Sequence, residues 1–187
     1  NIIPIHSVHF QDHQSPEVVM KCVKGKTLSE SLSGKPLRDE ELRQMLGILI
    51  QVCHPLEFSH SKGIIHRDIK PENIMAGTFG EVYLLDWGLA IDKNKIHNSA
   101  RGLVGTPAYM APEMVLGDPL IIDDRTDVYL LGATLHEFLT GKRRHSAPSI
   151  PIALTQAENS DQYEYTSEVL PDLAQMANIA CSKNPDD

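Results

Sequence analysis

The segment "HRDIKPEN", residues 66–73, places three chemically useful side chains within a few positions of one another. Asp68 supplies a carboxylate that can accept a hydrogen bond from an alcohol, and Lys70 supplies a positive charge two residues later. Asn73 adds an amide oxygen, and Mg²⁺ takes hard oxygen ligands of this type alongside phosphate oxygens. The alternative role for Asp68 and Asn73 is to cap turns, which Asp and Asn do often.

Three further motifs follow this segment in a fixed order. They are "DWG" at residues 86–88, "GTPAYMAPE" at 105–113 and "DRTDVYLLG" at 124–132. In this order and spacing the four motifs resemble the protein kinase family, and specifically the large lobe of a serine/threonine kinase. The resemblance covers essentially the whole chain, and four motifs in sequence are far more specific than "HRD" alone.

The resemblance implies catalytic roles for five residues. Asp68 would orient the substrate hydroxyl, and Lys70 would neutralise charge on the transferred γ-phosphate. Asp86 would be the principal ligand of Mg²⁺, and Asn73 would bind a second ion. Thr106 would line the substrate site near Asp68. The implied cofactors are therefore ATP and Mg²⁺, and the implied partner is a protein with a Ser or Thr hydroxyl, because a lysine at position 70 resembles serine/threonine kinases.

Structural roles follow from the same resemblance. His66 is expected to pack and bond backbone atoms beneath the loop, and Trp87 replaces the usual Phe after the metal-binding aspartate. Asp127 resembles the buried aspartate that holds the loop backbone, although a carboxylate favoured by a helix N-terminus is also compatible. Glu113 normally pairs with an arginine that the family pattern supplies after the last residue here. We therefore expect a largely buried carboxylate without its partner.

Arg67 resembles the arginine that binds a phosphorylated activation segment in many kinases. That segment, residues 86–113, offers the hydroxyls of Ser99, Thr106 and Tyr109. Because Thr106 is assigned to the substrate site, Ser99 is the predicted phosphorylation site, whose added charge would pair with Arg67. An unmodified loop serine is the alternative.

The stretch "VVMKCVKGKTL", residues 18–28, resembles the strand and hinge that join the two kinase lobes. By this alignment Met20 is the gatekeeper, and the backbone of Lys21 and Val23 would bind adenine. Met75 would form part of the pocket floor. The family commonly has Glu where Lys21 stands, but backbone atoms make the bonds, so we expect little loss. Ordinary core filling by Met20 and Met75 is compatible with these roles.

The stretch "GTFGEVYLLDWGLAIDK", residues 77–93, imitates a phosphate-binding glycine loop followed by a lysine. In the family that loop precedes both the hinge and the "HRD" segment, whereas Gly77 and Gly80 follow both. We predict instead a tight hairpin turn with Phe79 at its tip. Lys93 lies beyond "DWG" and cannot be the strand lysine. The glycine loop and the strand lysine are thus missing from these residues.

The remaining pattern predicts an α+β, protein-kinase-like fold with a mostly helical C-terminal lobe, short β-hairpins and a truncated small lobe. Residues 1–23 would be a remnant of the small lobe, comprising its last two strands and the hinge, and 24–187 a large lobe truncated at its C-terminal end. Helices are predicted over about 39–60, with a kink or an early end at Pro55, over 125–140, and within "SIPIALTQAEN" and "PDLAQMANIACSK". "KRRH", residues 142–145, is interpreted as a solvated basic turn.

Composition restricts partners and location. The net charge of −8 gives no electrostatic reason to expect nucleic acid, and no apolar run approaches the roughly 18 residues of a membrane span. The three cysteines form no CxxC pair, so neither zinc nor disulfides are indicated, and a reducing, cytoplasmic location is expected. Nothing in the sequence indicates the oligomeric state.

The function that these observations favour is a catalytic-domain fragment of an ATP-dependent protein serine/threonine kinase, inactive by itself. The alternative is a pseudokinase or scaffold that binds protein partners without phosphorylating them. Intact Asp68, Lys70, Asn73 and Asp86 argue against that alternative, because a non-catalytic domain has no chemical need for all four. A small-molecule kinase is disfavoured because such enzymes lack the "GTPAYMAPE" segment.

Overall fold

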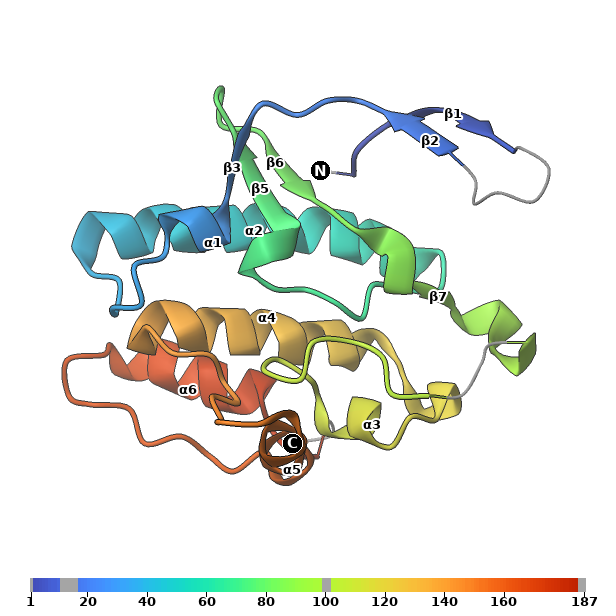
Figure 1. The fold of residues 1–187 in the computed structure, drawn as a ribbon. Helices are drawn as coiled ribbons and strands as arrows, with labels where there is room; N and C mark the ends of the chain where they lie inside the picture. Colours follow the sequence, from blue (N-terminus) through green and yellow to red (C-terminus); the bar gives the residue numbers. More distant parts are fainter. Residues whose placement is uncertain (1, 11–16, 99–101, 185–187) are drawn as a thin grey trace.

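The computed structural model describes residues 2–10, 17–98 and 102–184, apart from the side chains at 96–98 (Figure 1). Short strands dominate the N-terminal part and helices the remainder, which confirms the predicted α+β class. The strands are β1 (Ile5–His9), β2 (Glu17–Met20), β3 (Gly25–Thr27), β4 (Ile64–Ile65), β5 (Ile74–Gly77), β6 (Val82–Leu84) and β7 (Ile91–Asp92). The α-helices are α1 (Leu28–Ser31), α2 (Asp39–Ser61), α3 (Pro112–Val115), α4 (Asp124–Thr140), α5 (Ile150–Asn159) and α6 (Pro171–Ala180). Four 3₁₀ helices complete the described elements: η1 (Pro71–Asn73), η2 (Trp87–Leu89), η3 (Lys93–Asn98) and η4 (Pro119–Ile121).

The strands form small antiparallel sheets, β1–β2, β3–β5–β6 and β4–β7. The β5–β6 pair confirms the predicted hairpin, with Met75 opposite Tyr83. In its turn the Gly77 amide donates to the Glu81 carbonyl (2.7 Å), and Gly80 has a φ of +83°. Phe79 at the tip is 93% exposed. The glycines of this stretch therefore serve a turn, and the chain reverses there instead of enclosing phosphates.

Helix α4 forms the centre of the helical body. Figure 1 shows α2 on one side of it and α6 on the other, and both pack against it. It begins where the Asp123 carboxylate accepts a hydrogen bond from the Arg125 amide (2.8 Å), and Gly141 ends it in the left-handed conformation. Its fully buried side chains include Leu130, Phe138 and Leu139. Bounds and burial match the predicted central helix.

Gly141 offers a test of this helix end. It has a φ of +71°, and an added Cβ would lie 2.6 Å from the Lys35 backbone carbon. Gly141→Ala is expected to lower the free energy of unfolding by about 2–4 kcal/mol, since left-handed strain and a backbone clash add together. Gly80→Ala is the matched control, because Gly80 has a φ of +83° but no atom within 4 Å of an added Cβ. Equal losses for the two variants in urea titrations would contradict the clash.

Helix α2 matches the helix predicted over about 39–60 and contains Pro55. The helix runs through Pro55 to Ser61, so of the two predicted alternatives, a kink or an early end, the early end does not occur. Pro55 removes only one amide from the ladder, and its side chain is buried beside Val52 and Leu56, which face the core. Burial of this face outweighs the lost bond. None of the described helices has the length and apolar character needed to cross a membrane.

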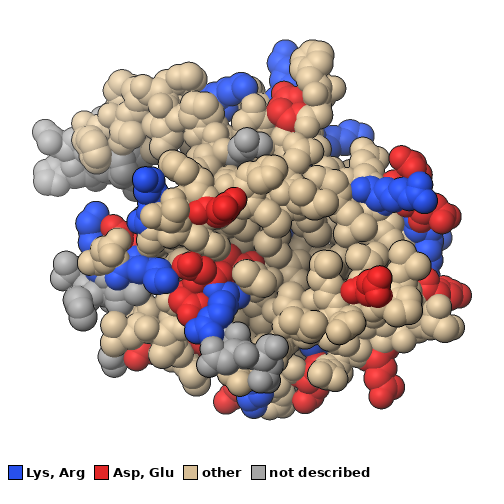
Figure 2. Space-filling model, turned by 180° about the vertical axis from the view of Figure 1, so that it is seen from behind, with Lys and Arg blue, Asp and Glu red and all other residues tan. Residues whose placement is uncertain are grey.

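The surface carries no broad area of one charge on the face drawn in Figure 2. Lys and Arg are interspersed there with Asp and Glu. This mixture agrees with the net charge of −8, which leaves acidic residues in modest excess. On this face no single-sign area is present that would steer a charged partner toward it.

Two buried histidines make stability depend on pH. Burial, followed by the nearby Arg144 charge, lowers the pKa of His136 to about 3 and that of His145 to about 4. In the unfolded chain each histidine has its ordinary pKa of 6.5 and binds a proton below that pH, whereas the folded chain keeps it neutral. The contribution of these histidines to the free energy of unfolding is therefore fully present above pH 6.5 and falls as the pH drops toward 4. We expect a loss of about 2 kcal/mol per histidine between pH 7 and pH 5 in urea titrations.

The variant His136→Phe isolates one of these contributions. Between pH 7 and pH 5 its free energy of unfolding should fall by about 2 kcal/mol less than that of the wild-type chain, because one buried proton acceptor is gone. His54→Gln, which removes an exposed imidazole, is the matched control. An unchanged pH dependence in His136→Phe would contradict the account.

Candidate active site

The buried carboxylate of Asp127 holds the "HRD" loop. Its Oδ1 accepts a hydrogen bond from the Arg67 amide and its Oδ2 one from the His66 amide, both at 2.9 Å. The Oδ2 also accepts from His60 Nε2 at 2.7 Å. Arg67 has a φ of +68°, a left-handed conformation that costs energy in a non-glycine residue. The first turn of α4 thus fixes the backbone just before Asp68.

His66 lies beneath this loop with its side chain fully buried. Its Nε2 donates to the Leu85 carbonyl (2.9 Å), and its Nδ1 accepts from the Asp68 amide (3.2 Å). These two backbone partners select the neutral tautomer with hydrogen on Nε2, and burial lowers the pKa of the imidazole accordingly. The Trp87 ring packs edge-on at 4.6 Å. His66 therefore joins the loop to the segment that carries Asp86.

The carboxylate of Asp68 stands at the centre of a polar cluster. Its Oδ1 accepts from Thr106 Oγ1 (2.7 Å), and its Oδ2 accepts from Lys70 Nζ (2.7 Å) and Asn73 Nδ2 (2.9 Å). Lys70 Nζ also donates to Thr106 Oγ1 (2.6 Å). A carboxylate has about four acceptor positions, so these three donors leave about one for a further hydroxyl. Four residues predicted separately are thus brought together.

Asn73 ends η1 and faces this cluster with its nitrogen. The Nδ2 donates to the Asp68 backbone carbonyl (2.7 Å) as well as to the carboxylate. This orientation leaves the amide oxygen of Asn73 as an acceptor or metal ligand. The Leu85 amide donates to the Asn73 carbonyl (2.8 Å), which brings the end of the β5–β6 hairpin beside the loop.

Asp86 follows Leu85 directly and is exposed. Its backbone is left-handed (φ 55°, ψ 71°), and its Oδ1 caps η2 by accepting from the Gly88 amide (3.2 Å). The His66 imidazole bonds the Asp68 amide through Nδ1 and the carbonyl of Leu85, the residue before Asp86, through Nε2. Asp68 and Asp86 therefore share one region of the fold.

The side chains in this region that could bind a metal ion offer hard oxygen atoms. The Asp86 carboxylate and the Asn73 amide oxygen are the ligand types that suit Mg²⁺. No group of three or more His, Cys, Asp or Glu side chains within the described residues could hold a metal ion unaided. An ion here would complete its shell with water or phosphate oxygens, as Mg²⁺ commonly does.

The residues assigned to adenine lie around β2, β3 and the hairpin. Met20 ends β2 and is 47% exposed, while Val23 and Met75 are half-buried. The Lys21 amide donates to the Pro4 carbonyl (3.0 Å), and Lys21 Nζ donates to the Tyr83 hydroxyl (2.8 Å). The side chain of Lys21 is thus held against β6, a contact that the sequence pattern did not indicate.

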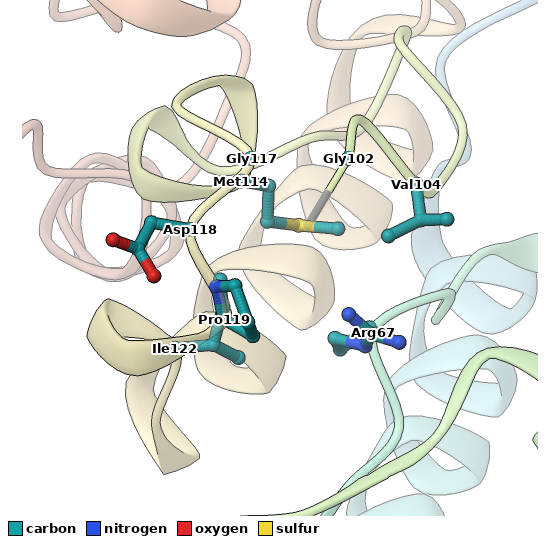
Figure 3. Close-up of a pocket in the computed structure, with 8 residues that line it drawn as sticks. All are labelled: Arg67, Gly102, Val104, Met114, Gly117, Asp118, Pro119 and Ile122. Carbon is teal, nitrogen blue, oxygen red and sulfur yellow. The ribbon is translucent and has the colours of Figure 1, made fainter. Parts of the chain in front are cut away.

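Arg67 turns its side chain toward the segment before α4. Its Nε donates to the Leu89 carbonyl (2.6 Å), and it pairs with no carboxylate in the described part of the chain. It lines a cavity of about 10 Å³ with Val104, Met114 and Ile122 (Figure 3). This volume suits about one water molecule. Ser99, its predicted phosphorylated partner, lies outside the described residues.

Glu113 corrects one expectation. It is half-buried, and its Oε1 accepts a hydrogen bond from Thr126 Oγ1 (2.6 Å), so the predicted unpaired, largely buried carboxylate is wrong. The reason is geometric, because α3 brings Glu113 to the first turn of α4. Glu113 also borders a cavity of about 140 Å³ between α4 and α6, which keeps it partly solvated.

Two partners in this region had no signal in the sequence. His60 lies 67 residues from Asp127 along the chain and belongs to no motif, yet its Nε2 bonds the Asp127 carboxylate. Leu85 acts through its backbone, whose bonding does not depend on side-chain identity. Only the packing of α2 against α4 and of the hairpin against the loop reveals these contacts.

A helical body whose central helix anchors a loop with an aspartate, a lysine and an asparagine has the construction of a phosphoryl-transfer domain. The family model described as "Protein kinase domain" matches residues 1–187. The chain belongs to the protein kinase family.

Two curated proteins show the relationship in more detail. Serine/threonine-protein kinase PknD of Protochlamydia amoebophila (strain UWE25) is 35% identical over 169 residues, which cover 75% of this chain and 17% of that protein. Serine/threonine-protein kinase PknD of Chlamydia trachomatis serovar D is 32% identical over 224 aligned residues, which cover 100% of this chain and 23% of that protein. The chain therefore spans less than a quarter of the length of these relatives.

Proposed function

We propose that the chain serves as the catalytic domain of a protein serine/threonine kinase, which transfers the γ-phosphate of ATP to a Ser or Thr hydroxyl of another protein. The observation that carries the proposal is the Asp68 carboxylate, bonded to Lys70, Asn73 and Thr106 with about one acceptor position left. The names of the relatives support the choice of Ser and Thr as acceptors.

In this proposal Asp68 accepts the hydrogen bond of the substrate hydroxyl and aims its oxygen at phosphorus. The oxygen–phosphorus bond forms as the bond to the ADP oxygen breaks, and the hydroxyl proton passes to the carboxylate. Lys70, already within 2.7 Å of that carboxylate, places positive charge where the transferred group becomes more negative. Thr106 fixes both side chains through its hydroxyl.

The remaining assignments complete the proposal. The Asn73 oxygen and the Asp86 carboxylate would hold Mg²⁺, which neutralises phosphate charge when bound. Met20, Lys21, Val23 and Met75 would contact adenine at the junction of a small-lobe part, residues 1–23, with a large-lobe part, 24–187.

Other residues would support this site without touching substrate. Arg67 and Ser99 would regulate the activation segment, and the supporting positions are His66, Trp87, Glu113 and Asp127. A pseudokinase is the competing proposal, and no described contact favours it.

The test is transfer of labelled γ-phosphate by the gene product as the cell makes it, offered serine, threonine and tyrosine peptides with Mg²⁺. We expect Ser and Thr peptides to be labelled. Signals no higher than those of an Asp68→Asn variant would favour the pseudokinase, and labelling of small alcohols alone would favour a different phosphotransferase.

Replacing Asp86 tests the metal assignment separately. Asp86→Asn is expected to lower the transfer rate by about 10²–10³-fold, because a carboxylate that binds the cation is lost. The rate should recover in part as Mg²⁺ is raised. Asp92→Asn is the matched control, since within the described residues the Asp92 carboxylate bonds the nearby Asn94 amide and Lys95 of η3. Equal effects of the two substitutions would contradict the assignment.

A further inference from the structure

The "KRRH" segment borders a cavity of about 410 Å³, which His136 of α4 also lines. Helix α5 and residues 161–163 form the other walls. The prediction of a solvated basic turn is wrong for the second half of this segment, because His145 is 2% exposed and Arg144 is half-buried. The side chains turn inward and leave a basic hollow.

Arg144 has no carboxylate partner among residues 2–10, 17–98 and 102–184. Its guanidinium donates to the backbone carbonyl of Asp161. Its charge also disfavours protonation of His136 and His145. Lys142 is exposed and likewise has no ion pair in the described ranges, whereas Arg143 is neutralised by Glu72 at 3.0 Å. Lys142 and Arg144 thus line the cavity without an ion-pair partner in the described ranges. Asp161 also lines it and is acidic.

A buried imidazole adds a neutral donor to this wall. His136 is 1% exposed, its Nδ1 bonds the Tyr165 hydroxyl (2.9 Å), and its ring lies edge-on to Tyr163 at 4.5 Å. No described residue bonds Nε2. With the Tyr165 hydroxyl donating to Nδ1, the neutral ring carries its hydrogen on Nε2, where an oxyanion can accept it. The two tyrosines hold the ring in place.

We propose that this cavity binds a phosphomonoester. The Arg144 guanidinium matches two phosphate oxygens, Lys142 adds a point charge, and His136 donates through Nε2. Thr155 and Gln156 of α5 supply hydrogen bonds for the polar remainder of the ligand. The volume lies in the range of small-molecule sites. An anion bound here would give the half-buried Arg144 guanidinium a partner of opposite charge, which a buried charge needs. This site is separate from the Asp68 cluster and does not depend on the kinase proposal.

The direct test is a titration of the full gene product with phenyl phosphate, in which the backbone amide NMR shifts of the residues that line the cavity are followed. We expect saturable shifts in residues 142–146 and 155–163, with a dissociation constant below about 1 mM. Arg144→Gln should weaken binding at least about tenfold and Lys142→Gln about threefold, because each removes a charge-assisted contact. Lys24→Gln, an exposed lysine in the N-terminal part, should leave binding unchanged.

Two outcomes would overturn the proposal. One is the absence of saturable shifts at about 10 mM phenyl phosphate, a concentration that detects even weak sites. The other is equal binding by wild type, Lys142→Gln and Arg144→Gln, or equal shifts with uncharged benzyl alcohol. Lys142 is exposed, so its variant keeps the test valid should Arg144→Gln fail to fold. Phosphoserine and a serine-phosphorylated peptide, compared at equal concentration, then distinguish a free metabolite from a modified protein as the source.

Discussion

Asp68→Asn is expected to lower the rate of γ-phosphate transfer by about 10²–10⁴-fold, the range over which a positioned acid or base contributes. The amide would present a nitrogen where the carboxylate now accepts from Lys70, Asn73 or Thr106, and would lose the charge that draws the hydroxyl proton. The dissociation constant for ATP should change by no more than about threefold, because this carboxylate binds the acceptor and not the nucleotide.

The comparison needs a control carboxylate and a check of folding. Asp172→Asn removes an exposed charge from the first turn of α6 and should leave the rate unchanged. Steady-state transfer to a serine peptide and far-ultraviolet circular dichroism should be measured on all three proteins. A transfer rate for Asp68→Asn above about one tenth of the wild-type rate would contradict the proposal that Asp68 accepts the proton of the substrate hydroxyl.

Asp127→Ala should be the most destabilising single change in the site, with a loss of about 3–5 kcal/mol in the free energy of unfolding. The substitution leaves the buried amides of His66 and Arg67 and the imidazole of His60 without their acceptor. It also releases Arg67 from a left-handed backbone conformation that the carboxylate helps to maintain. Transfer activity should fall with it, since the loop positions Asp68.

Asp124→Ala is the matched control for this prediction. Asp124 lies in the same first turn of α4, but it is half-buried, and within the described residues its carboxylate makes one ion pair, with Lys93 at 3.1 Å. Its loss should be below about 1 kcal/mol. A carboxylate that acted only on the helix dipole would contribute about 0.3–1 kcal/mol, so similar losses for the two variants would favour that simpler role for Asp127.

The sequence predicted the parts of the fold that local chemistry determines. The motif order indicated the family and the residues that gather around Asp68, because loops of this kind carry function in side-chain identity. The apolar pattern and Gly141 defined α4, and the position of Gly77 and Gly80 after the "HRD" segment identified a hairpin. For α4 and the hairpin the decisive residues are close together along the chain.

What could not be predicted depends on contacts between distant segments. The apolar pattern predicted the helix over about 39–60, but local rules for proline left open whether it ends at Pro55, because that depends on burial of one helix face. The Glu113–Thr126 bond required the placement of α3 beside α4. "KRRH" has the composition of a solvated turn, yet Arg144 and His145 are drawn inward by the elements packed around them. Tertiary packing decided these cases.

The central claim is that Asp68, Asn73 and Asp86 border a single site for a metal-bound triphosphate. The most direct measurement replaces Mg²⁺ by paramagnetic Mn²⁺ in the presence of ATP and follows the broadening of backbone amide signals in the full gene product. The account predicts early and selective loss of the signals of residues 68–73 and 86–88. Broadening that begins instead at the acidic residues 123–124, or that spreads evenly over the surface, would contradict it.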